Sequence, residues 1–455
     1  MATTYLNRTP SSEGNRKTWT FSTWFKVGNI TSGAFFTAGA SGQDEMTIRL
    51  EESGGNLRID WQLYKVSNTS TIGRLVTNKV FRDPAAWYHL VCRYDSTNST
   101  AGDRMRMYIN GVEETSFSTD TNPTLNYDAM VNNTVIHNIG RQSWNNSGYF
   151  DGYLSQTILA DGQSYAPTVF GSTNANGVWV PNTSPSVTYG TNGFKIDYAG
   201  TGTSADANGF GADSSGQTNH YTSNNLGTNP NTKDTPHNLF CTMTPLDKGS
   251  NAGTLSLGNL KMTNGTSGSA DNQKFRGTMA VTKGKWYFEM KKLANTASIG
   301  LLATEEKINQ TSASGMLVEY LHQGELRYWN GSSRVTKTTG IDAYTTNDIV
   351  GCALDMDNRR AYFHKNGFYQ GDPTPDPASS PSGAGQMAAI LANFTMSPCF
   401  MDDTTASAGQ AAMNFGAPAY TIASGNADAN GYGNFEYAVP SGYYALCTKN
   451  LAQYG

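Results

Sequence analysis

A β-meander pattern at residues 348–371 constrains the fold of this chain more than any other feature. Residues 349–356 alternate between two faces, which is the period of a strand. Asp357-Asn358 then supplies turn residues, and residues 360–365 form a second strand-like run. Asn366-Gly367 follows, and this pair is a strong hairpin signal because both residues tolerate positive φ. The stretch predicts antiparallel strands and no helix.

The same pattern occurs earlier, at residues 92–95 and 104–111. In both places a strand passes through Cys-x-x-Asp, turns in polar residues, returns through Arg and Tyr, and ends at Asn-Gly. Two copies of one pattern predict two β-sandwiches in tandem.

The composition agrees with an all-β chain of more than one domain. A length of 455 residues exceeds what one core usually supports. Charged residues make up 15%, below the roughly 25% that is usual for soluble domains, and there are 48 glycines. This balance is typical of turn-rich β-structure rather than helical bundles.

Charge and hydropathy exclude several kinds of partner. A net charge of −4 provides no basic footprint, so we expect no nucleic-acid partner. The sequence has no run of 18 apolar residues, so we expect no membrane insertion. The first residues lack a basic segment followed by an apolar one, which predicts folding in a reducing cytosol. Five widely spaced cysteines, with no Cys-x-x-Cys, predict free buried thiols.

Strand-like segments recur through the first third of the chain. Residues 18–27 and 87–95 alternate large and small side chains, and short strands lie between them. Three features, Trp19-Thr-Phe-Ser-Thr-Trp-Phe, Trp87-Tyr-His-Leu-Val and the Phe150-Asp-Gly-Tyr-Leu-Ser strand, resemble laminin-G/pentraxin-like and concanavalin-A-like jelly rolls. The resemblance covers residues 1–170 and implies an antiparallel β-sandwich.

Residues 171–270 are rich in Gly, Asn, Thr and Ser and predict an ordered connector or a small β-region. Aromatic and apolar residues within this range are expected to anchor it to its neighbours. Asp213-Ser-Ser-Gly-Gln-Thr-Asn and Asp234-Thr-Pro-His-Asn-Leu-Phe resemble connector sequences of tailed-phage virion proteins of the marine podovirus type, and residues 439–451 resemble an ending found in phage structural proteins.

Residues 271–455 predict a second sandwich. Gly284-Lys-Trp-Tyr-Phe-Glu, Ile299-Gly-Leu, the meander, Ser397-Pro-Cys-Phe and Asn414-Phe-Gly come in the order of the motifs of a SPRY domain, which this region resembles. The fold class is therefore expected to be all-β, with a laminin-G-like jelly roll, a connector and a SPRY-like sandwich.

Catalytic patterns are missing from the sequence. Retaining glucanases of the concanavalin-A fold place carboxylates on one strand face about 5 Å apart, and no such run occurs. Glu51 and Glu52 are adjacent and so point to opposite faces, whereas Asp355 and Asp357 share a face but border a turn. The histidines are scattered, without metal spacing. We expect no enzyme.

Aromatic and amide residues in expected loops indicate ligand binding instead. Trp144, Asn145 and Tyr149 suit a sugar, because aromatic faces stack on sugar rings and amides bond hydroxyls. Trp329 is a second candidate, although its strand-like surroundings also suit a core residue. No cofactor is predicted; the laminin-G resemblance allows calcium, with Asp95 and Asp151 as candidates, and both also suit ordinary turn and strand-end roles.

Together these features predict a non-enzymatic phage virion protein. We expect a tail-associated appendage or fibre-type adhesin that assembles with other virion proteins, forms a homo-oligomer and contacts a host-surface glycan or protein. The alternatives are a capsid decoration protein, a glycan-degrading enzyme of the concanavalin-A fold, and a cellular adaptor that carries a SPRY module.

Overall fold

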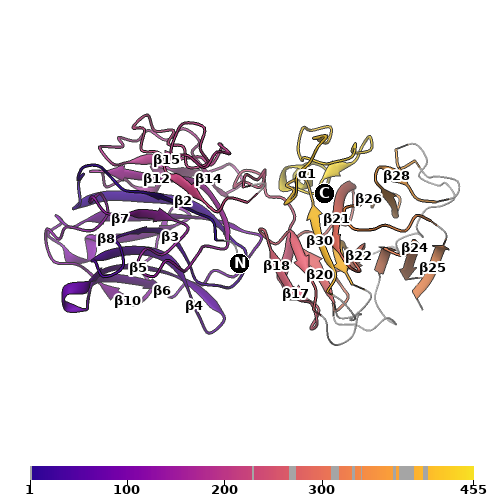
Figure 1. Ribbon diagram of the computed structural model, residues 1–455, viewed down its shortest axis with the longest axis horizontal. Coiled ribbons are helices and arrows are strands. Elements are labelled where there is room, and N and C mark those ends of the chain that lie inside the picture. The colour runs from indigo at the N-terminus through magenta and orange to yellow at the C-terminus, as the bar shows by residue number, and fades with distance from the viewer. Residues whose placement is uncertain are drawn as a thin grey trace. The chain divides into compact units, whose positions relative to one another are not determined.

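The computed structural model describes residues 3–227, 230–265, 273–308, 317–329, 334–339, 341–371, 376–378, 394–402 and 408–455, without the side chains at 68, 329, 334 and 336–339. The chain forms two compact units, Met1–Asn231 and Thr232–Gly455 (Figure 1). The all-β prediction is confirmed. The described helical elements are α1 (Thr448–Tyr454) and the 3₁₀ turns η1 (Val66–Asn68), η2 (Ala101–Asp103) and η3 (Pro167–Val169). Among the described helices, none has the length and apolar character needed to cross a membrane.

The first unit is a sandwich of two antiparallel sheets. Sheet A runs in the order β10 (Phe117–Thr121), β6 (Ser70–Thr77), β5 (Asn56–Lys65), β4 (Glu45–Ser53), β3 (Gly33–Ala38), β11 (His137–Ile139), β1 (Tyr5–Arg8) and β16 (Thr222–Asn224). Sheet B runs in the order β15 (Phe194–Ile196), β12 (Gly152–Asp161), β2 (Thr18–Val27), β7 (Trp87–Asp95), β8 (Met105–Ile109) and β9 (Val112–Glu113).

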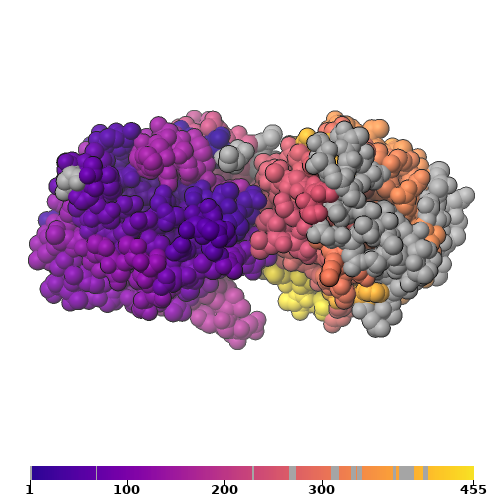
Figure 2. Space-filling model, turned by 90° about the horizontal axis from the view of Figure 1, so that it is seen from below, coloured from indigo at the N-terminus to yellow at the C-terminus, as the bar shows by residue number. Residues whose placement is uncertain are grey.

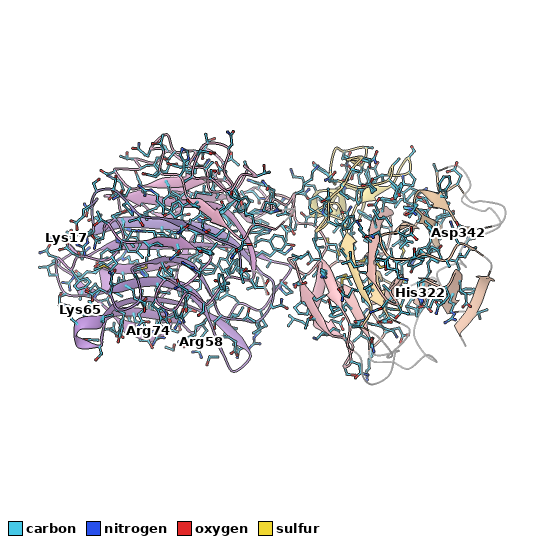
Figure 3. All side chains as sticks on the ribbon, viewed as in Figure 1. Lys17, Arg58, Lys65, Arg74, His322 and Asp342 are labelled. Carbon is cyan, nitrogen blue, oxygen red and sulfur yellow. The ribbon has the colours of Figure 1, made fainter. Side chains whose placement is uncertain are left out.

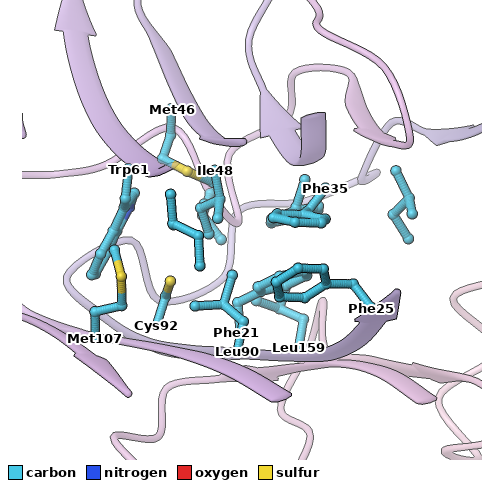
Figure 4. Packing of buried hydrophobic residues seen from close by; sticks show 14 of the residues in the cluster. Phe21, Phe25, Phe35, Met46, Ile48, Trp61, Leu90, Cys92, Met107 and Leu159 are labelled. Carbon is cyan, nitrogen blue, oxygen red and sulfur yellow. The ribbon is translucent and has the colours of Figure 1, made fainter. Parts of the chain in front are cut away.

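The core of the first unit lies between these sheets, where large side chains alternate inward along each strand. The facing groups are Phe21, Phe25, Leu90, Cys92, Met107 and Leu159 from sheet B and Phe35, Met46, Ile48 and Trp61 from sheet A (Figure 4). Rings of Phe21 and Phe36 stack at 4.9 Å. Each such buried side chain contributes about 1.5–3 kcal/mol to stability.

The segment that follows β12 covers the outer face of sheet B. The hairpin of β13 (Gly171–Thr173) and β14 (Trp179–Pro181) lies in the covering segment. Phe170 of that segment is fully buried with Val91 and Ile158 of the sheet. The space-filling view shows residues of the first unit that are distant in sequence packed into one continuous surface (Figure 2).

The range 171–270 is divided between the units. Its first part adds β15 and β16 to the first sandwich and buries Phe194 and Tyr221 in that core. Its last part supplies β17 (Met243–Lys248), β18 (Thr254–Ser256) and β19 (Lys261–Thr263) to the second unit. Aromatic residues of the range therefore act as anchors in the unit to which each part belongs.

The second unit is also built from two sheets. One runs in the order β17, β20 (Lys274–Gly277), β29 (Met396–Met401), β22 (Ser298–Ala303), β23 (Leu317–Leu321), β24 (Glu325–Trp329) and β25 (Arg334–Thr339). The other runs in the order β18, β19, β30 (Gln410–Asn414), β21 (Lys285–Ala294), β26 (Ile349–Asp355), β27 (Arg360–Lys365) and β28 (Phe368–Tyr369), with β31 (Tyr444–Ala445) paired to β21.

The predicted meander forms the strands β26, β27 and β28. Asp355 closes the first turn by accepting the Asn358 backbone N–H at 2.9 Å. Asn366 and Gly367 form the second turn at φ 49° and 87°, the left-handed region that this pair tolerates.

Candidate functional site

The candidate site is the 141–149 loop, which connects β11 to β12. Its ends are joined by a hydrogen bond from Gln142 N to Ser147 O, at 2.9 Å. Asn146 and Gly148 adopt positive φ, of 54° and 58°, as the tight reversal requires. Trp144 is therefore presented from a loop that its own backbone closes.

The three predicted residues of this loop differ in exposure. Trp144 is 46% exposed, and Asn145 is also exposed. The side-chain oxygen of Asn145 accepts Ser147 N at 3.1 Å, so this amide shapes the loop. Tyr149 is half-buried, with its ring centroid 6.1 Å from that of Tyr5.

Arg141 joins this aromatic pair to the sheet. Its guanidinium lies 3.8 Å from the ring centroid of Tyr5 on β1, a cation–π contact. The same guanidinium donates to Asn138 Oδ1 at 3.2 Å. Tyr5 and Arg141 were not predicted as site residues, since only the pairing of β1 with β11 places them together.

Hydrogen bonds hold the loop against the outer face of sheet A, which is the face opposite the core. Ser143 Oγ lies 2.6 Å from Thr37 Oγ1 on β3 and accepts Asn138 Nδ2 at 2.7 Å. Thr37 Oγ1 also lies 3.0 Å from Arg141 O. These contacts bury Thr37 and Asn138 completely and hold the loop against the sheet.

A row of polar side chains continues from the loop across sheet A. The neighbours of Thr47 along β4, Met46 and Ile48, are core residues, so Thr47 points outward. Successive strand registers place in one row Thr222, Asn7, Asn138, Thr37, Thr47, Gln62 and Arg74. The row crosses the strands of the sheet and presents hydroxyl, amide and guanidinium groups.

Arg49 and Arg74 form ion pairs with Asp60 and Glu51 on this outer face of sheet A. Asp60, which is fully buried, accepts Arg49 Nε and Arg74 Nε, each at 2.9 Å. Glu51 accepts Arg49 at 2.9 Å. The hydrogen bond to Asp60 raises the pKa of Arg74. Arg74 lies on the side of the sheet that faces away from sheet B (Figure 3).

Glu45 is a carboxylate outside that network. Burial raises its pKa to about 7, against an opposing effect of Arg49. Its Oε2 atom is buried without a hydrogen-bond partner in the described part of the chain. Burial therefore keeps Glu45 protonated to a higher pH than an exposed glutamate.

The two calcium candidates have local structural partners. Asp95 Oδ1 accepts the backbone N–H of Thr97 at 3.1 Å, as a turn aspartate does. Asp151 Oδ2 accepts the Asn29 amide at 2.8 Å. Within the described residues, no group of three or more His, Cys, Asp or Glu side chains is placed to hold a metal ion.

The fold also separates these two aspartates. Asp95 pairs with Thr18 at the start of β2, whereas Gly152, next to Asp151, pairs with Val27 at the end of β2. A strand of 10 residues extends on the order of 30 Å. Asp95 and Asp151 therefore cannot share one ion.

Trp329 ends β24, and its side chain lies outside the described part of the structure.

Ser22 and His89 form a buried hydrogen-bonded pair in sheet B, and its geometry suits a structural role. Trp179 Nε1 donates to His89 Nδ1 at 3.0 Å, so a neutral His89 carries its proton on Nε2 and donates to Ser22 Oγ at 2.8 Å. Burial lowers the pKa of His89 to about 3. A general base would need a free Nε2 lone pair facing the serine, which is the opposite arrangement.

The second unit holds a buried polar chain that the sequence did not indicate. Gly367 N donates to His364 Nδ1 at 3.2 Å, so His364 Nε2 donates to the Tyr287 oxygen at 2.7 Å. Tyr287 in turn donates to Glu289 Oε1 at 3.0 Å. Burial lowers the pKa of His364 to about 3 and raises that of Glu289. The alternation of Tyr287 and Glu289 along β21 is a sequence signal that could have indicated it.

The segments 213–219, 234–240 and 439–451 each have a structural position in their own unit. The Asp213 carboxylate accepts the backbone N–H groups of Lys195, Ser215 and Asn219, each at 2.9 Å, which closes a loop of the first unit.

The other two elements meet within the second unit. Leu239 N donates to Thr448 Oγ1 at 3.0 Å, and Thr448 N donates to Leu239 O at 2.9 Å. Asn238 Oδ1 accepts Lys449 N at 3.1 Å. The segment 234–240 therefore packs on the start of α1.

Comparisons with known proteins address the fold. The SPRY domain of human HERC1 is 18% identical, with a TM-score of 0.28, over 38% of this chain and 96% of that one. Mouse laminin α1 chain domains LG4-5 are 9% identical, with a TM-score of 0.28, over 90% and 85%. A heptameric SAP-like pentraxin from Limulus polyphemus is 17% identical, with a TM-score of 0.27, over 41% and 88%. A search of curated proteins gives no match.

A family model matches part of the first unit, which contains the 141–149 loop. Residues 2–163 match Laminin_G_3, described as the concanavalin A-like lectin/glucanases superfamily. The chain thus carries a laminin-G-like, concanavalin-A-like domain in its first unit.

Proposed function

We propose that this protein is a non-enzymatic virion component of a tailed phage, a tail-associated appendage that binds a host-surface glycan through the 141–149 loop. It assembles with other virion proteins and with further copies of itself. The described geometry supports the glycan contact in this proposal.

The observation that carries the glycan proposal is Trp144, exposed on a closed loop beside the Tyr5–Tyr149–Arg141 cluster. A large indole held in water by a preformed loop loses little conformational entropy when a ligand stacks on it. Hydroxyl and amide groups of sheet A continue from the foot of this loop, which suits a ligand rich in hydroxyls.

The virion proposal is supported by sequence elements alone. The segments 213–219, 234–240 and 439–451 resemble those of phage structural proteins, and each now has a place in holding its unit together.

A localisation experiment tests the virion proposal. Particles of the encoding phage are purified, labelled with an antibody against this chain and imaged by electron microscopy. We expect label at the tail. Label over the head would show that the chain is a capsid decoration protein and not a tail appendage. Particles without label would refute the virion role.

A glycan array tests the binding proposal. We expect the chain to bind a set of host-surface glycans and Trp144→Ala to lose about fivefold or more in affinity, since an aromatic stacking contact contributes about 1–3 kcal/mol. Phe368→Ala is the matched control, because Phe368 is 77% exposed but belongs to the second unit. Equal losses in both variants would contradict a site at Trp144.

Chelation tests the expectation that no cofactor is needed. We expect EGTA to leave both the Tm and glycan binding unchanged, because Asp95 and Asp151 already have protein partners. A Tm that rises with added calcium, with the rise abolished by Asp151→Asn, would instead assign a calcium site.

A further inference from the structure

We infer that the glycan bound at the 141–149 loop carries a carboxylate, and that Arg141 binds this group. This inference rests on the proposed glycan binding and adds the charge class of the ligand and the residue that selects it. Trp144 contacts the sugar ring, and Arg141 contacts the acidic group of the same glycan.

Arg141 is a charged side chain that has no carboxylate partner in the described part of the chain. Its guanidinium lies 3.8 Å from the ring centroid of Tyr5, and Nη2 donates to Asn138 Oδ1 at 3.2 Å. A phenol ring and an amide are both neutral, so neither contact balances the charge. Because a guanidinium is always ionised in proteins, Arg141 presents a fixed positive charge without a counter-ion.

Part of this guanidinium is open to a ligand. Arg141 is half-buried, and its Nε is fully buried, so Nε is out of reach. Nη1 has no hydrogen-bond partner among the described residues and, unlike Nε, keeps contact with solvent. The Tyr5 ring and Asn138 already hold the guanidinium in place, so binding an anion there costs little side-chain entropy.

The side chains around Arg141 on sheet A are uncharged. Leu6 and Ile139 point into the core, so the residues that alternate with them along the paired strands point to the outer face. On β1, β11, β3 and β16 these outward residues are Tyr5, Asn7, Asn138, Thr37, Thr222 and Asn224. Asp151 follows the loop in sequence, but it leads into β12 of sheet B and accepts the Asn29 amide.

The charged groups on the rest of this outer face lie on β4, β5 and β6, and the two signs are equal in number. They are Arg49, Arg58 and Arg74, with Glu45, Glu51 and Asp60. Arg49, which stands opposite Ala34 beside the loop, is paired with Asp60 and Glu51. In the order β4-β3-β11-β1, β4 lies three strands from Tyr5, which is roughly 14 Å. Since salt screens exposed charges over about 8 Å, these groups neither neutralise Arg141 nor repel an acid bound to it.

Trp144 and Arg141 are close enough to contact one short glycan. They lie three residues apart in the sequence, and such a segment spans at most about 10 Å. The hydrogen bond from Gln142 N to Ser147 O closes the loop between them. An acidic sugar offers a ring face for the indole and a planar carboxylate that matches the guanidinium fork.

The test compares matched pairs of glycans on an array, in which each acidic glycan stands beside its carboxyl-reduced form. We expect the chain to bind the acidic member about tenfold more tightly or better, since hydrogen bonds to charged groups are stronger than neutral ones. Equal binding of both members, or tighter binding of the reduced one, would overturn the inference and leave the loop site standing. If no glycan binds at all, the proposed function itself fails.

Two variants assign the preference to Arg141. Arg141→Gln removes the charge, so it should abolish the preference and leave binding of the reduced member unchanged, which also shows that the loop is intact. Arg141→Lys should keep a smaller preference, because an ammonium retains the charge but lacks the fork. A preference that survives Arg141→Gln would refute the role of Arg141. If Arg141→Gln loses both members, the lysine variant decides, and equal binding of both members by it would refute the role of the charge.

Arg58→Gln is the matched control, because Arg58 is an arginine of the same outer face, on β5 and away from the loop (Figure 3). It should leave the preference unchanged, and an equal loss in this variant and in Arg141→Gln would assign the preference to the charge of the whole sheet and overturn the inference. A sulfated form of the same glycan tests the carboxylate itself. Tighter binding of the sulfated form than of the carboxylated form would contradict the proposed ligand class.

Discussion

Asn110 and Asn366 show how far the sequence repeat reaches into the structure. Asn110 exchanges two hydrogen bonds with His89, through its backbone N–H and its side-chain oxygen. Asn366 makes the same two bonds to Ile349. Both asparagines have positive φ, of 50° and 49°. The Asn-Gly pairs therefore do more than reverse the chain, because each asparagine also hydrogen-bonds to the first strand of its meander.

Asn366 also donates its side-chain amide to Asp348 Oδ1 at 2.8 Å, so its side chain makes two hydrogen bonds. This arrangement predicts that Asn366→Gly destabilises the second unit by about 1–3 kcal/mol, the net value of two hydrogen bonds. Glycine retains the positive φ, so the loss reports the side-chain bonds. Asn366→Ala should cost about another 1 kcal/mol because alanine is strained at that φ. Chemical denaturation measures both, and equal stabilities of the two variants would contradict the separation.

Glu45 predicts a pH dependence of stability. Its pKa rises from 4.5 to about 7 on folding, so the unfolded chain ionises first as the pH increases. The folded state then loses stability between these values, and Glu45→Gln should be more stable than the natural chain by about 1–2 kcal/mol at pH 8, allowing for solvent screening. Below pH 4 the two should be equal. Denaturant titrations at both pH values check this, and a difference of the opposite sign would contradict it.

Glu289 should be essential for the second unit. It is fully buried and accepts the backbone N–H groups of Glu436 and Tyr437 at 3.0 and 2.9 Å. Glu289→Ala leaves these donors and Tyr287 without an acceptor, which should cost about 3–5 kcal/mol. The first unit serves as the internal control, since its unfolding should not change.

Strands and turns of the meander follow directly from alternation and turn chemistry, because both are local properties. The order of the strands in the sheets does not follow from these local patterns. β1 pairs with β11 and β16, which are distant in sequence, and only this pairing places Tyr5 under Arg141. Trp144, Asn145 and Tyr149 were predicted from local composition, whereas the row through Asn7, Asn138, Thr37 and Thr47 required the register between strands.

The end of the chain is a structural element of the second unit. Asn450, fully buried, donates to Asp428 Oδ2 at 2.7 Å and to Ala445 O at 2.8 Å. We expect a chain that ends at Cys447 to lose α1 and these bonds, lowering the Tm of the second unit by several degrees. Calorimetry of the shortened and full chains measures this, and an unchanged second transition would show that α1 is dispensable.

The two compact units should behave as separate folding domains. Met1–Asn231 and Thr232–Gly455 each contain their own core. We expect each fragment, expressed alone, to unfold cooperatively at the temperature of one transition of the full chain. A single transition in the full chain, shifted from those of both fragments, would show that the units stabilise each other.

The prediction of buried thiols is confirmed: Cys92, Cys241, Cys352, Cys399 and Cys447 are all buried and outside any disulfide. Burial also raises the pKa of several of them, which lowers their reactivity. A thiol reagent should therefore react negligibly with the native chain and with all 5 cysteines after denaturation.

The amino-acid sequence alone was enough to predict an all-β chain, its Asn-Gly turns, its buried thiols and an aromatic loop at Trp144, because alternation, turn chemistry and composition act over a few residues. Tertiary structure decided which distant strands are neighbours and how the range 171–270 divides between the units. It also decided which polar side chains face one another, as Glu45 and Tyr64 do. The physical reason is that a sheet joins residues through register between strands, and register depends on the packing of the whole core.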